Sequence, residues 1–235
     1  MTTSSETTDF PAPSHRRVRL WAILGAVFAL IIAGGVLYYL FRPLAAPIPA
    51  GAGAEYAGLP DGYTDQGFPR LGKPDAPIVV EEFLSFACPH CREFHEQWFP
   101  DLLSQIASGQ VEYVVIPVSS IGWGAGSAAK GALCAGEQGK FWEMHDVLFD
   151  WQKRFLTSTF NERRIRKGAK NMGLDTAVFD SCMSENHPKA VLDAAQSEFR
   201  ERGLAGTPTL FVNGQQVFDY HELENLSDGL PHEAS

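Results

Sequence analysis

Two cysteines separated by two residues, Cys88 and Cys91, stand where a strand-like segment gives way to a helix-like one. The preceding residues, Pro77–Phe86, are rich in β-branched and aromatic side chains, which is typical of a buried strand. Pro89 suits the first position of a helix, and apolar residues then recur every three or four positions as far as Ile106. The pair therefore lies at a strand-to-helix junction, which constrains both the fold and the chemistry.

The remaining segments repeat this alternation once and then depart from it. Val111–Val118 has the composition of a second strand, and residues 122–203 carry a helical pattern. Asn213 and Gly214 then join two short strand-like runs, which is the signal of a tight hairpin. A strand–helix–strand unit with short connections implies parallel neighbours and a right-handed crossover, whereas the hairpin extends the sheet in antiparallel fashion. The predicted fold class is α/β, thioredoxin-like, with an all-helical insertion at about 122–203.

Several residues mark where individual helices begin or end. Pro100 is expected to kink or split the helix that Pro89 opens, because proline lacks the amide that a helix interior needs. The run Thr159–Glu162 resembles a capping box, and Asp175 is expected to cap the helix that carries Cys182. These signals divide the helical part into short, separately capped helices.

The N-terminal part carries one long apolar stretch. Residues 20–41 include no charge, and about 22 helical residues span a hydrocarbon core of roughly 30 Å. Arg16, Arg17 and Arg19 precede the stretch, and basic residues favour the cytoplasmic side of a membrane. The sequence therefore predicts an uncleaved, single-pass transmembrane signal-anchor at 20–41, which locates the protein in the cell membrane with its N-terminus cytoplasmic.

The apolar stretch also sets the predicted division of the chain. Residues 1–19 form a cytoplasmic tail, 42–76 a Pro/Gly/Ala-rich linker and lead-in, and 77–235 an extracytoplasmic domain. The alternative is a cleaved signal peptide with a small-residue site at Ala52–Ala54, although the apolar stretch exceeds the ~7–15 residues typical of such peptides. Both interpretations place the domain in a compartment where disulfides persist.

The charge balance restricts the partners. The net charge is -9 at pH 7, and the first 42 residues contribute +2 through four arginines against Glu6 and Asp9, so the remainder carries -11. A nucleic-acid-binding face is basic. The acidic domain therefore argues against nucleic acid as a partner.

The spacing of Cys88 and Cys91 leaves few chemical roles. Haem attachment requires a histidine directly after the second cysteine, where this chain has Arg92. A structural zinc site needs further ligands, and although His90 and His95 are close in sequence, no second ligand pair follows. A disulfide across so short a loop constrains the chain little. A redox pair is the interpretation that the position favours.

The strand-to-helix position gives this redox chemistry a physical basis. Unpaired amides and the helix dipole stabilise an anion at the start of a helix, so a thiolate at Cys88 is favoured and acts as the nucleophile. Cys91, one turn further along, can attack the resulting mixed disulfide. His90, when protonated, adds positive charge beside the thiolate. Stabilising the thiolate stabilises the reduced form, which makes the disulfide a stronger oxidant.

Two segments resemble one known family. EFLSFACPHC (Glu82–Cys91) resembles the active-site segment of the DsbA family of thioredoxin-fold oxidases, and GTPTLFVNG (Gly206–Gly214) resembles its cis-proline loop and hairpin. The helical segments around Cys134 and Cys182 are similar to the insertion of its membrane-anchored relatives. The resemblance covers roughly residues 78–214. It assigns catalysis to the motif residues Cys88, Pro89, His90 and Cys91.

The resemblance also implies roles outside this motif. Pro208 should form a cis peptide bond and face the two cysteines, and Thr207 would offer backbone hydrogen bonds to an extended substrate. Glu82, six residues before the first cysteine, corresponds to a buried acid that exchanges a proton with the inner cysteine. Glu81 is its competitor, since alternation puts the two on opposite faces. His95 is predicted to lie on the helix surface.

Cys134 and Cys182 are predicted to form a structural disulfide within the helical insertion. Such a bond closes a loop of about 50 residues, which is worth on the order of 4 kcal/mol in the chain-entropy model. Free thiols and a second redox relay are the alternatives. We expect no metal and no cofactor.

These observations predict a membrane-anchored protein-disulfide oxidoreductase, an oxidase that forms disulfides in exported proteins with cysteine thiols. The resemblance implies a quinone-linked membrane protein that reoxidises it, and we expect a monomer. Thr207 departs from the valine of the best-known periplasmic oxidases, which keeps open a reductase, an isomerase or a maturation factor for one client. A non-catalytic peptide-binding module is the remaining alternative, although both cysteines are present.

Overall fold

The computed structural model describes residues 15–41, 44–155, 159–184, 187–224 and 226. The chain divides into two compact units between Leu44 and Ala45. The first unit contributes helix α1 (His15–Phe41), whose described side chains are exposed. Among the described residues, no helix combines the length and the apolar character that a membrane span requires. The predicted cytoplasmic tail lies outside the described part of the chain as far as residue 14.

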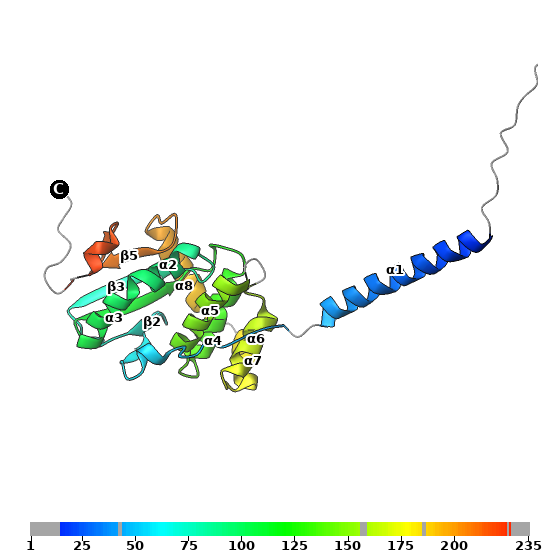
Figure 1. Ribbon diagram of the computed structural model, residues 1–235. Coiled ribbons are helices and arrows are strands. Elements are labelled where there is room, and N and C mark those ends of the chain that lie inside the picture. Colours follow the sequence, from blue (N-terminus) through cyan, green and yellow to red (C-terminus); the bar gives the residue numbers. More distant parts are fainter. Residues whose placement is uncertain (1–14, 42–43, 156–158, 185–186, 225, 227–235) are drawn as a thin grey trace, which may run out of the picture. The chain divides into compact units, whose positions relative to one another are not determined.

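The second unit is built on a sheet of six strands in the order β1-β2-β4-β3-β5-β6. Figure 1 labels β2, β3 and β5 of this sheet. β3 and β4 are parallel neighbours, whereas every other pairing is antiparallel. The strands are β1 (Asp61–Tyr63), β2 (Pro69–Leu71), β3 (Ile78–Leu84), β4 (Val111–Pro117), β5 (Thr209–Val212) and β6 (Gln215–Val217). The predicted parallel unit and the predicted antiparallel hairpin are both present in this sheet.

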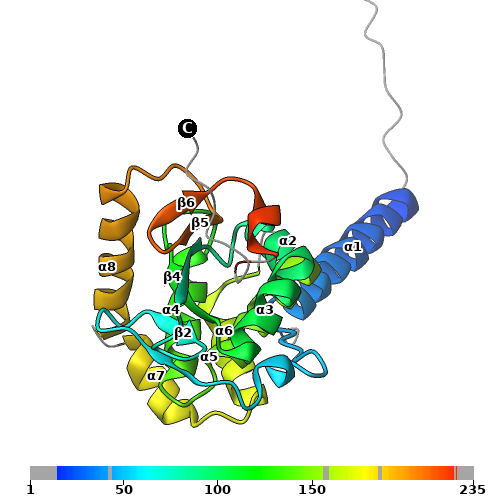
Figure 2. The same ribbon diagram turned by 90° about the vertical axis from the view of Figure 1, so that its left-hand side faces the viewer.

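Helices cover both faces of the sheet. Figure 2 shows α2 and α3 on one side of the strands and α8 on the other. Helix α4 packs against the four helices that follow it. The helices are α2 (Pro89–Gln97), α3 (Phe99–Ser108), α4 (Ala125–Gly136), α5 (Phe141–Phe155), α6 (Glu162–Asn171), α7 (Thr176–Ser184) and α8 (His187–Glu201), with 3-10 helices η1 (Ala54–Tyr56) and η3 (Tyr220–Leu223). Helices α4 to α8 lie within the range predicted for the insertion.

The predicted split after the active-site helix is confirmed. Trp98 ends α2 and also caps α3, so the two helices meet at one residue. Pro100 occupies the first turn of α3, where a missing amide costs no helical hydrogen bond. The proline therefore starts a new helix instead of interrupting an existing one.

Two predicted helix starts have different outcomes. Asp175 precedes α7 and accepts hydrogen bonds from the amides of Ala177 and Val178, as expected of a cap. The capping box predicted at Thr159–Glu162 is wrong in its first residue, because Asn161 caps α6 and accepts from the amide of Arg164. Asparagine is as good a cap as serine or threonine, and it lies next to the first helical residue.

The segment predicted as a linker and lead-in, residues 42–76, differs from that expectation. It includes β1 and β2, which pair with the rest of the sheet through β4. The Trp151 indole N–H donates to the carbonyl of Pro47 over 2.7 Å, and Ala46 is buried. From Ala45 onward the chain therefore belongs to the second unit and contributes to its core.

A disulfide joins two helices of the insertion. Cys134 on α4 and Cys182 on α7 are bonded, and they lie 48 positions apart in the sequence. Both half-cystines are buried in the core. The bond ties together helices that the chain connects only through α5 and α6.

Candidate functional site

The two other cysteines lie where β3 gives way to α2. Cys88 is the N-cap of α2 and Pro89 its first residue, as the sequence predicts. The amide of Cys88 donates to the carbonyl of Ser85 over 3.0 Å, and the amide of Ser85 donates to the Cys91 sulfur over 3.4 Å. The turn thus holds both sulfurs at the start of the helix. Cys88 is 6% exposed and Cys91 is completely buried.

A second loop meets this turn from far along the chain. The peptide bond between Thr207 and Pro208 is cis. The Cys88 thiol donates a hydrogen bond to the carbonyl of Thr207, with 2.9 Å between sulfur and oxygen. Thr207 is buried, and its hydroxyl has no hydrogen-bond partner among the described residues. The structure therefore brings the Thr207–Pro208 loop against the cysteine pair.

The environment separates the acidities of the two thiols. The pKa of Cys88 is lowered from 9.0 to about 5, mainly by a hydrogen bond from Cys91. Burial opposes this shift, whereas the Thr207 side chain and the amides of Cys91 and His90 add to it. Burial, the hydrogen bond to Cys88 and the nearby charge of Glu82 raise the pKa of Cys91 well above its ordinary value. At neutral pH the first cysteine is a thiolate while the second keeps its proton.

His90 contributes to the site through its backbone amide and not through its imidazole. Its side chain is 78% exposed and lies 3.5 Å from the Glu93 carboxylate. Its amide contributes to the low pKa of Cys88. The sequence predicted that a protonated imidazole would assist the thiolate, whereas in this structure the described contact of the imidazole is with Glu93.

Glu82 lies on the buried face of β3, directly beneath the cysteine helix. It is completely buried, and its carboxylate accepts a hydrogen bond from the Tyr113 hydroxyl of β4. His95 Nε2 of α2 lies 2.9 Å from Glu82 Oε2. Glu81 points to the opposite face, where it pairs with Arg202 over 2.8 Å. Between the two candidates, only Glu82 shares the interior with Cys91.

The prediction that His95 lies on the helix surface is wrong. Its side chain is 7% exposed and contacts Glu82, Tyr113 and Phe99. The available signal was its spacing, because His95 follows Cys91 by four residues and so lies on the same helix face. The sequence alone did not reveal that the partner of His95 inside the protein is the buried carboxylate of Glu82.

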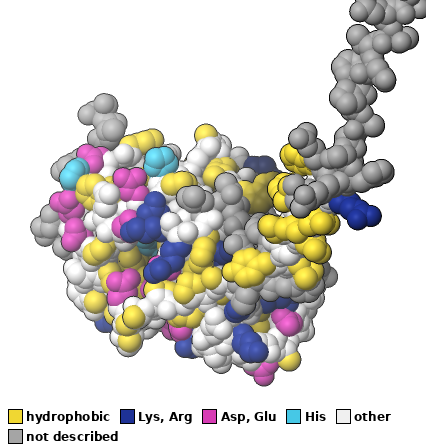
Figure 3. All heavy atoms as spheres, turned by 45° about the vertical axis from the view of Figure 1, so that its right-hand side comes forward, with side chains coloured by type: hydrophobic (Ala, Val, Ile, Leu, Met, Phe, Trp, Pro, Cys, Tyr) yellow, Lys and Arg dark blue, Asp and Glu magenta, His cyan; other side chains and the backbone are white. Residues whose placement is uncertain are grey.

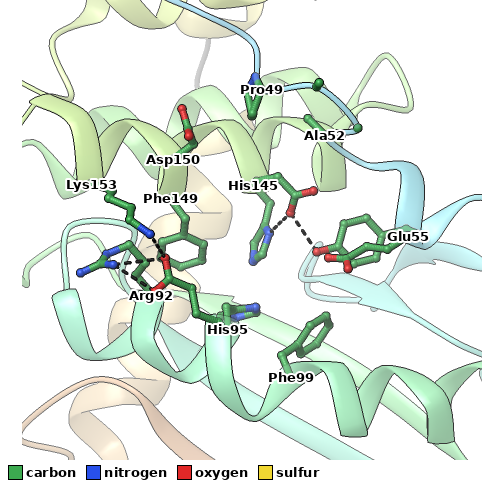
Figure 4. Close-up of a pocket in the computed structure, with 15 residues that line it drawn as sticks. Pro49, Ala52, Glu55, Arg92, His95, Phe99, His145, Phe149, Asp150 and Lys153 are labelled. Carbon is green, nitrogen blue, oxygen red and sulfur yellow. Dashed lines mark hydrogen bonds and ion pairs between the residues drawn. The ribbon is translucent and has the colours of Figure 1, made fainter.

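A further polar group, missed by the sequence, lies beside His95. His145 of α5 is buried, its Nδ1 lies 3.0 Å from Asp146 Oδ1, and the Tyr56 hydroxyl donates to the same oxygen over 2.9 Å. Figure 4 shows His95 and His145 pointing toward one another in a pocket of about 350 Å³. The amphipathic pattern of α5 indicated a buried face but not which partner that histidine would meet.

The rim of this pocket is charged. Glu96 pairs with Arg92 over 3.2 Å and with Lys153 over 3.3 Å. On the face drawn in Figure 3, acidic and basic side chains are interspersed with apolar ones. The rim charges therefore pair largely with each other instead of forming a field of one sign.

An apolar hollow lies next to the first cysteine. It has a volume of about 400 Å³, and the apolar part of its lining comes from Ala87, Pro89, Trp123 and Phe160. Its remaining lining residues are Arg92, Gln152 and Lys153. Trp123 is 87% exposed, which is unusual for so large an apolar side chain. An exposed aromatic residue beside a reactive sulfur is suited to contact a polypeptide substrate.

A family profile described as Thioredoxin matches residues 64–230, which is well over half of the chain. The chain belongs to the thioredoxin family. A fold of parallel β3 and β4 with a cysteine pair at the start of α2 agrees with this membership.

Relatives of this thioredoxin-family protein carry several names. Disulfide bond formation protein D of Bacillus subtilis is 26% identical over 176 residues, which cover 72% of this chain and 78% of that protein. Na(+)/H(+) antiporter NhaA 3 of Salinispora tropica is 27% identical over 213 residues, 88% of this chain but 32% of that protein. The chain thus spans about a third of the first curated relatives that it matches.

Among solved structures, a thioredoxin-like oxidoreductase from Silicibacter pomeroyi superimposes with a TM-score of 0.59. It is 26% identical, and the match covers 70% of this chain and 92% of that one. The resemblance of this thioredoxin-family protein to DsbA-type disulfide oxidoreductases, indicated by its motifs, is confirmed by these relatives.

Proposed function

We propose that the protein is a protein-disulfide oxidoreductase of the DsbA type, acting as an oxidase outside the cytoplasm. One observation carries the proposal: a hydrogen-bonded Cys88 thiol, with a pKa of about 5, lies at the start of α2 against the Thr207 carbonyl. A stabilised thiolate favours the reduced enzyme, so its disulfide gives up oxidising equivalents readily.

The reaction consists of two exchanges. A substrate thiolate attacks the Cys88 sulfur of the disulfide form, the Cys88–Cys91 bond breaks, and Cys91 leaves and takes up a proton. The second substrate thiolate then attacks its own partner sulfur in the mixed disulfide and expels the Cys88 thiolate. Two electrons pass from the substrate dithiol to the cysteine pair, and the low pKa of Cys88 makes it a good leaving group.

Substrate binding is supported by the geometry of the Thr207–Pro208 loop. Thr207 lies two residues before β5, and its carbonyl accepts a hydrogen bond from the Cys88 thiol. Backbone groups beside a strand can pair with an extended polypeptide. We assign Thr207 and Pro208 to substrate binding, with Trp123 as an apolar contact beside Cys88.

The wider biological setting is proposed from the sequence. The uncharged stretch at 20–41 and the three preceding arginines support a membrane anchor with the domain outside. Exported proteins with cysteine thiols would be the substrates of a monomeric enzyme, and a quinone-linked membrane protein would reoxidise it. Alkaline carbonate extraction of membranes, with protease accessibility of the domain, tests the anchor. Release of the protein into the carbonate supernatant would contradict it.

The reduction potential measured against glutathione decides the direction of electron flow. We expect the Cys88–Cys91 disulfide to be more oxidising than the glutathione couple. A potential near that of thioredoxin would instead favour the reductase, isomerase or client-specific alternative, which Thr207 keeps open. Cys88→Ser should abolish oxidation of a reduced model substrate such as ribonuclease. Unchanged oxidation by that variant would favour a non-catalytic binding module.

A further inference from the structure

A row of buried polar side chains leads from Glu82 to the pocket of Figure 4. Glu82 Oε2 lies 2.9 Å from His95 Nε2, and the rings of His95 and His145 are 4.5 Å apart between centroids. His145 Nδ1 lies 3.0 Å from Asp146 Oδ1. Both histidines line the pocket of about 350 Å³. The row thus connects the acid beneath Cys91 with a hollow that opens between α2 and α5.

Three buried atoms in this row have no hydrogen-bond partner among the described residues. They are Glu82 Oε1, His95 Nδ1 and His145 Nε2. Buried polar atoms in proteins are nearly always paired, so three in one cluster call for a reason. A group that gains and loses a proton during turnover is such a reason, because its partners differ between protonation states.

The electrostatics give the two histidines different tasks. Burial and the neighbouring His95 lower the pKa of His145, so its ring stays neutral. Burial opposes the ionisation of Asp146, but hydrogen bonds from His145, Gly53 and Tyr56 outweigh it and hold the pKa of that carboxyl low. The carboxylate fixes the His145 proton on Nδ1. Nε2 of His145 is then an acceptor beside His95.

We propose that His95 transfers the proton that Cys91 gains and loses, passing it between Glu82 and the pocket. This inference rests on the proposed function. When substrate reduces the disulfide, the departing Cys91 thiolate takes one proton from Glu82. His95 returns one proton to Glu82 through Nε2 and takes one at Nδ1 from the pocket side. Reoxidation runs the same transfers in reverse, and no further oxidant or reductant is required.

Few other groups around His95 can accept or donate the transferred proton. The Tyr113 hydroxyl is bonded to Glu82, and burial raises its pKa far above the ordinary value, so it donates without losing its proton. From α3, Phe99 covers the ring with an apolar face. The other ionisable side chains that line the pocket come from three elements: Arg92 and Glu96 of α2, Glu55 and Tyr56 of η1, and His145, Asp146, Asp150 and Lys153 of α5. His95 acts through Glu82 and is a positioning residue, not a catalytic one.

The test replaces His95 by glutamine, which keeps an N–H donor near Nε2 but cannot transfer a proton. Stopped-flow reduction of the oxidised enzyme by a dithiol peptide measures the rate at which Cys91 is released. We expect H95Q to slow this step by about 100-fold, the lower end of the range for positioned proton transfer, and to enlarge its solvent isotope effect. His221→Gln, which changes an exposed histidine paired with Glu224, should react at the unmodified rate.

Two results would overturn the relay. One is an H95Q protein with the unmodified rate and isotope effect. The other uses the unaltered protein and so remains available if H95Q does not fold. It is a set of ¹⁵N spectra in which the His95 ring keeps one tautomer in both redox forms from about pH 5 to about pH 9, a range that brackets the ordinary histidine pKa. Failure of the proposed function looks different, because the unaltered protein would then show no exchange dependent on Cys88.

Discussion

The sulfur of Cys88 and the main-chain oxygen of Thr207 lie 2.9 Å apart, joined by a hydrogen bond between residues 119 positions apart in the chain. The bond places the nucleophile against the loop that carries the cis peptide bond. Under the proposed function, a substrate that forms a mixed disulfide with Cys88 would lie beside Thr207. The proposed nucleophile and the proposed substrate-binding residue thus meet at this point of the structure.

The first prediction concerns the reactivity of the thiols with pH. Alkylation of the reduced protein by iodoacetamide should occur at Cys88 with an inflection at about 5, the pKa of that thiol. Cys91 should stay unmodified, because it is buried and its pKa is raised. Peptide mass mapping measures both rates, and Cys88→Ser provides the control for Cys91. Modification of Cys91 before Cys88 would contradict the assignment of the nucleophile.

A second prediction links the same thiol to stability. The folded pKa of Cys88 is about 5, below its ordinary value of 9.0. Ionisation therefore stabilises the folded, reduced protein fully above the unfolded pKa, and this contribution is lost as the pH falls through about 5. Denaturation of the reduced protein at several pH values should show it. The Cys88→Ser protein lacks the thiol and should not show this pH-dependent component.

The third prediction concerns Thr207. Its side chain contributes to the low pKa of Cys88, and its buried hydroxyl has no other hydrogen-bond partner among the described residues. Thr207→Val keeps the shape and removes the donor, so the alkylation inflection of Cys88 should move to higher pH. Thr209→Val is the matched control, since that hydroxyl donates to the carbonyl of Gly206 over 2.9 Å. An unmoved inflection in Thr207→Val would contradict this role.

The fourth prediction separates the two neighbouring acids of β3. Glu82→Gln keeps an acceptor for the Tyr113 hydroxyl but cannot exchange a proton with Cys91, so dithiol exchange should slow by about 100-fold at neutral pH. Glu81→Gln breaks a partly exposed pair with Arg202 and should cost about 0.2–1 kcal/mol of stability with unchanged exchange. Insulin reduction and urea denaturation measure the two effects. Equal exchange rates in both variants would argue against Glu82.

The fifth prediction concerns the disulfide in the insertion. Its loop of 48 residues corresponds to about 4 kcal/mol in the chain-entropy model. Replacing both Cys134 and Cys182 by alanine should lower the free energy of unfolding by roughly 2–5 kcal/mol without abolishing exchange at Cys88. Urea denaturation measures the loss. If exchange disappears while the variant stays folded, the pair takes part in redox chemistry.

The sequence predicted those parts of the fold that local signals determine. The junction at Cys88, the new helix at Pro100 and the turn at Asn213 follow from strand composition and from the conformational limits of proline and glycine. Strands β1 and β2 are only three residues long and contain glycine or proline. β2 pairs with β4, and β1 pairs with β2, so both strands depend on pairing with distant parts of the chain, which no local pattern records.

The residues of the candidate site also differ in whether the sequence could predict them. Cys88 and Cys91 were indicated by their strand-to-helix position, and Thr207 and Glu82 by the family resemblance. His95 and His145 were not, because they come from α2 and α5 and meet only after the helices pack. A buried histidine has no sequence signature of its own, since its meaning depends on the neighbour it reaches.

The attachment of residues 45–71 to the domain has a practical consequence. Cutting the chain at Pro77, where the sequence places the start of the domain, would remove two strands, the acceptor of the Trp151 indole and two hydrogen bonds to Asp146. We therefore expect the smallest unit able to fold alone to begin at about Ala45, where the second compact unit starts. A shorter version would be expected to misfold even though its redox motif is intact.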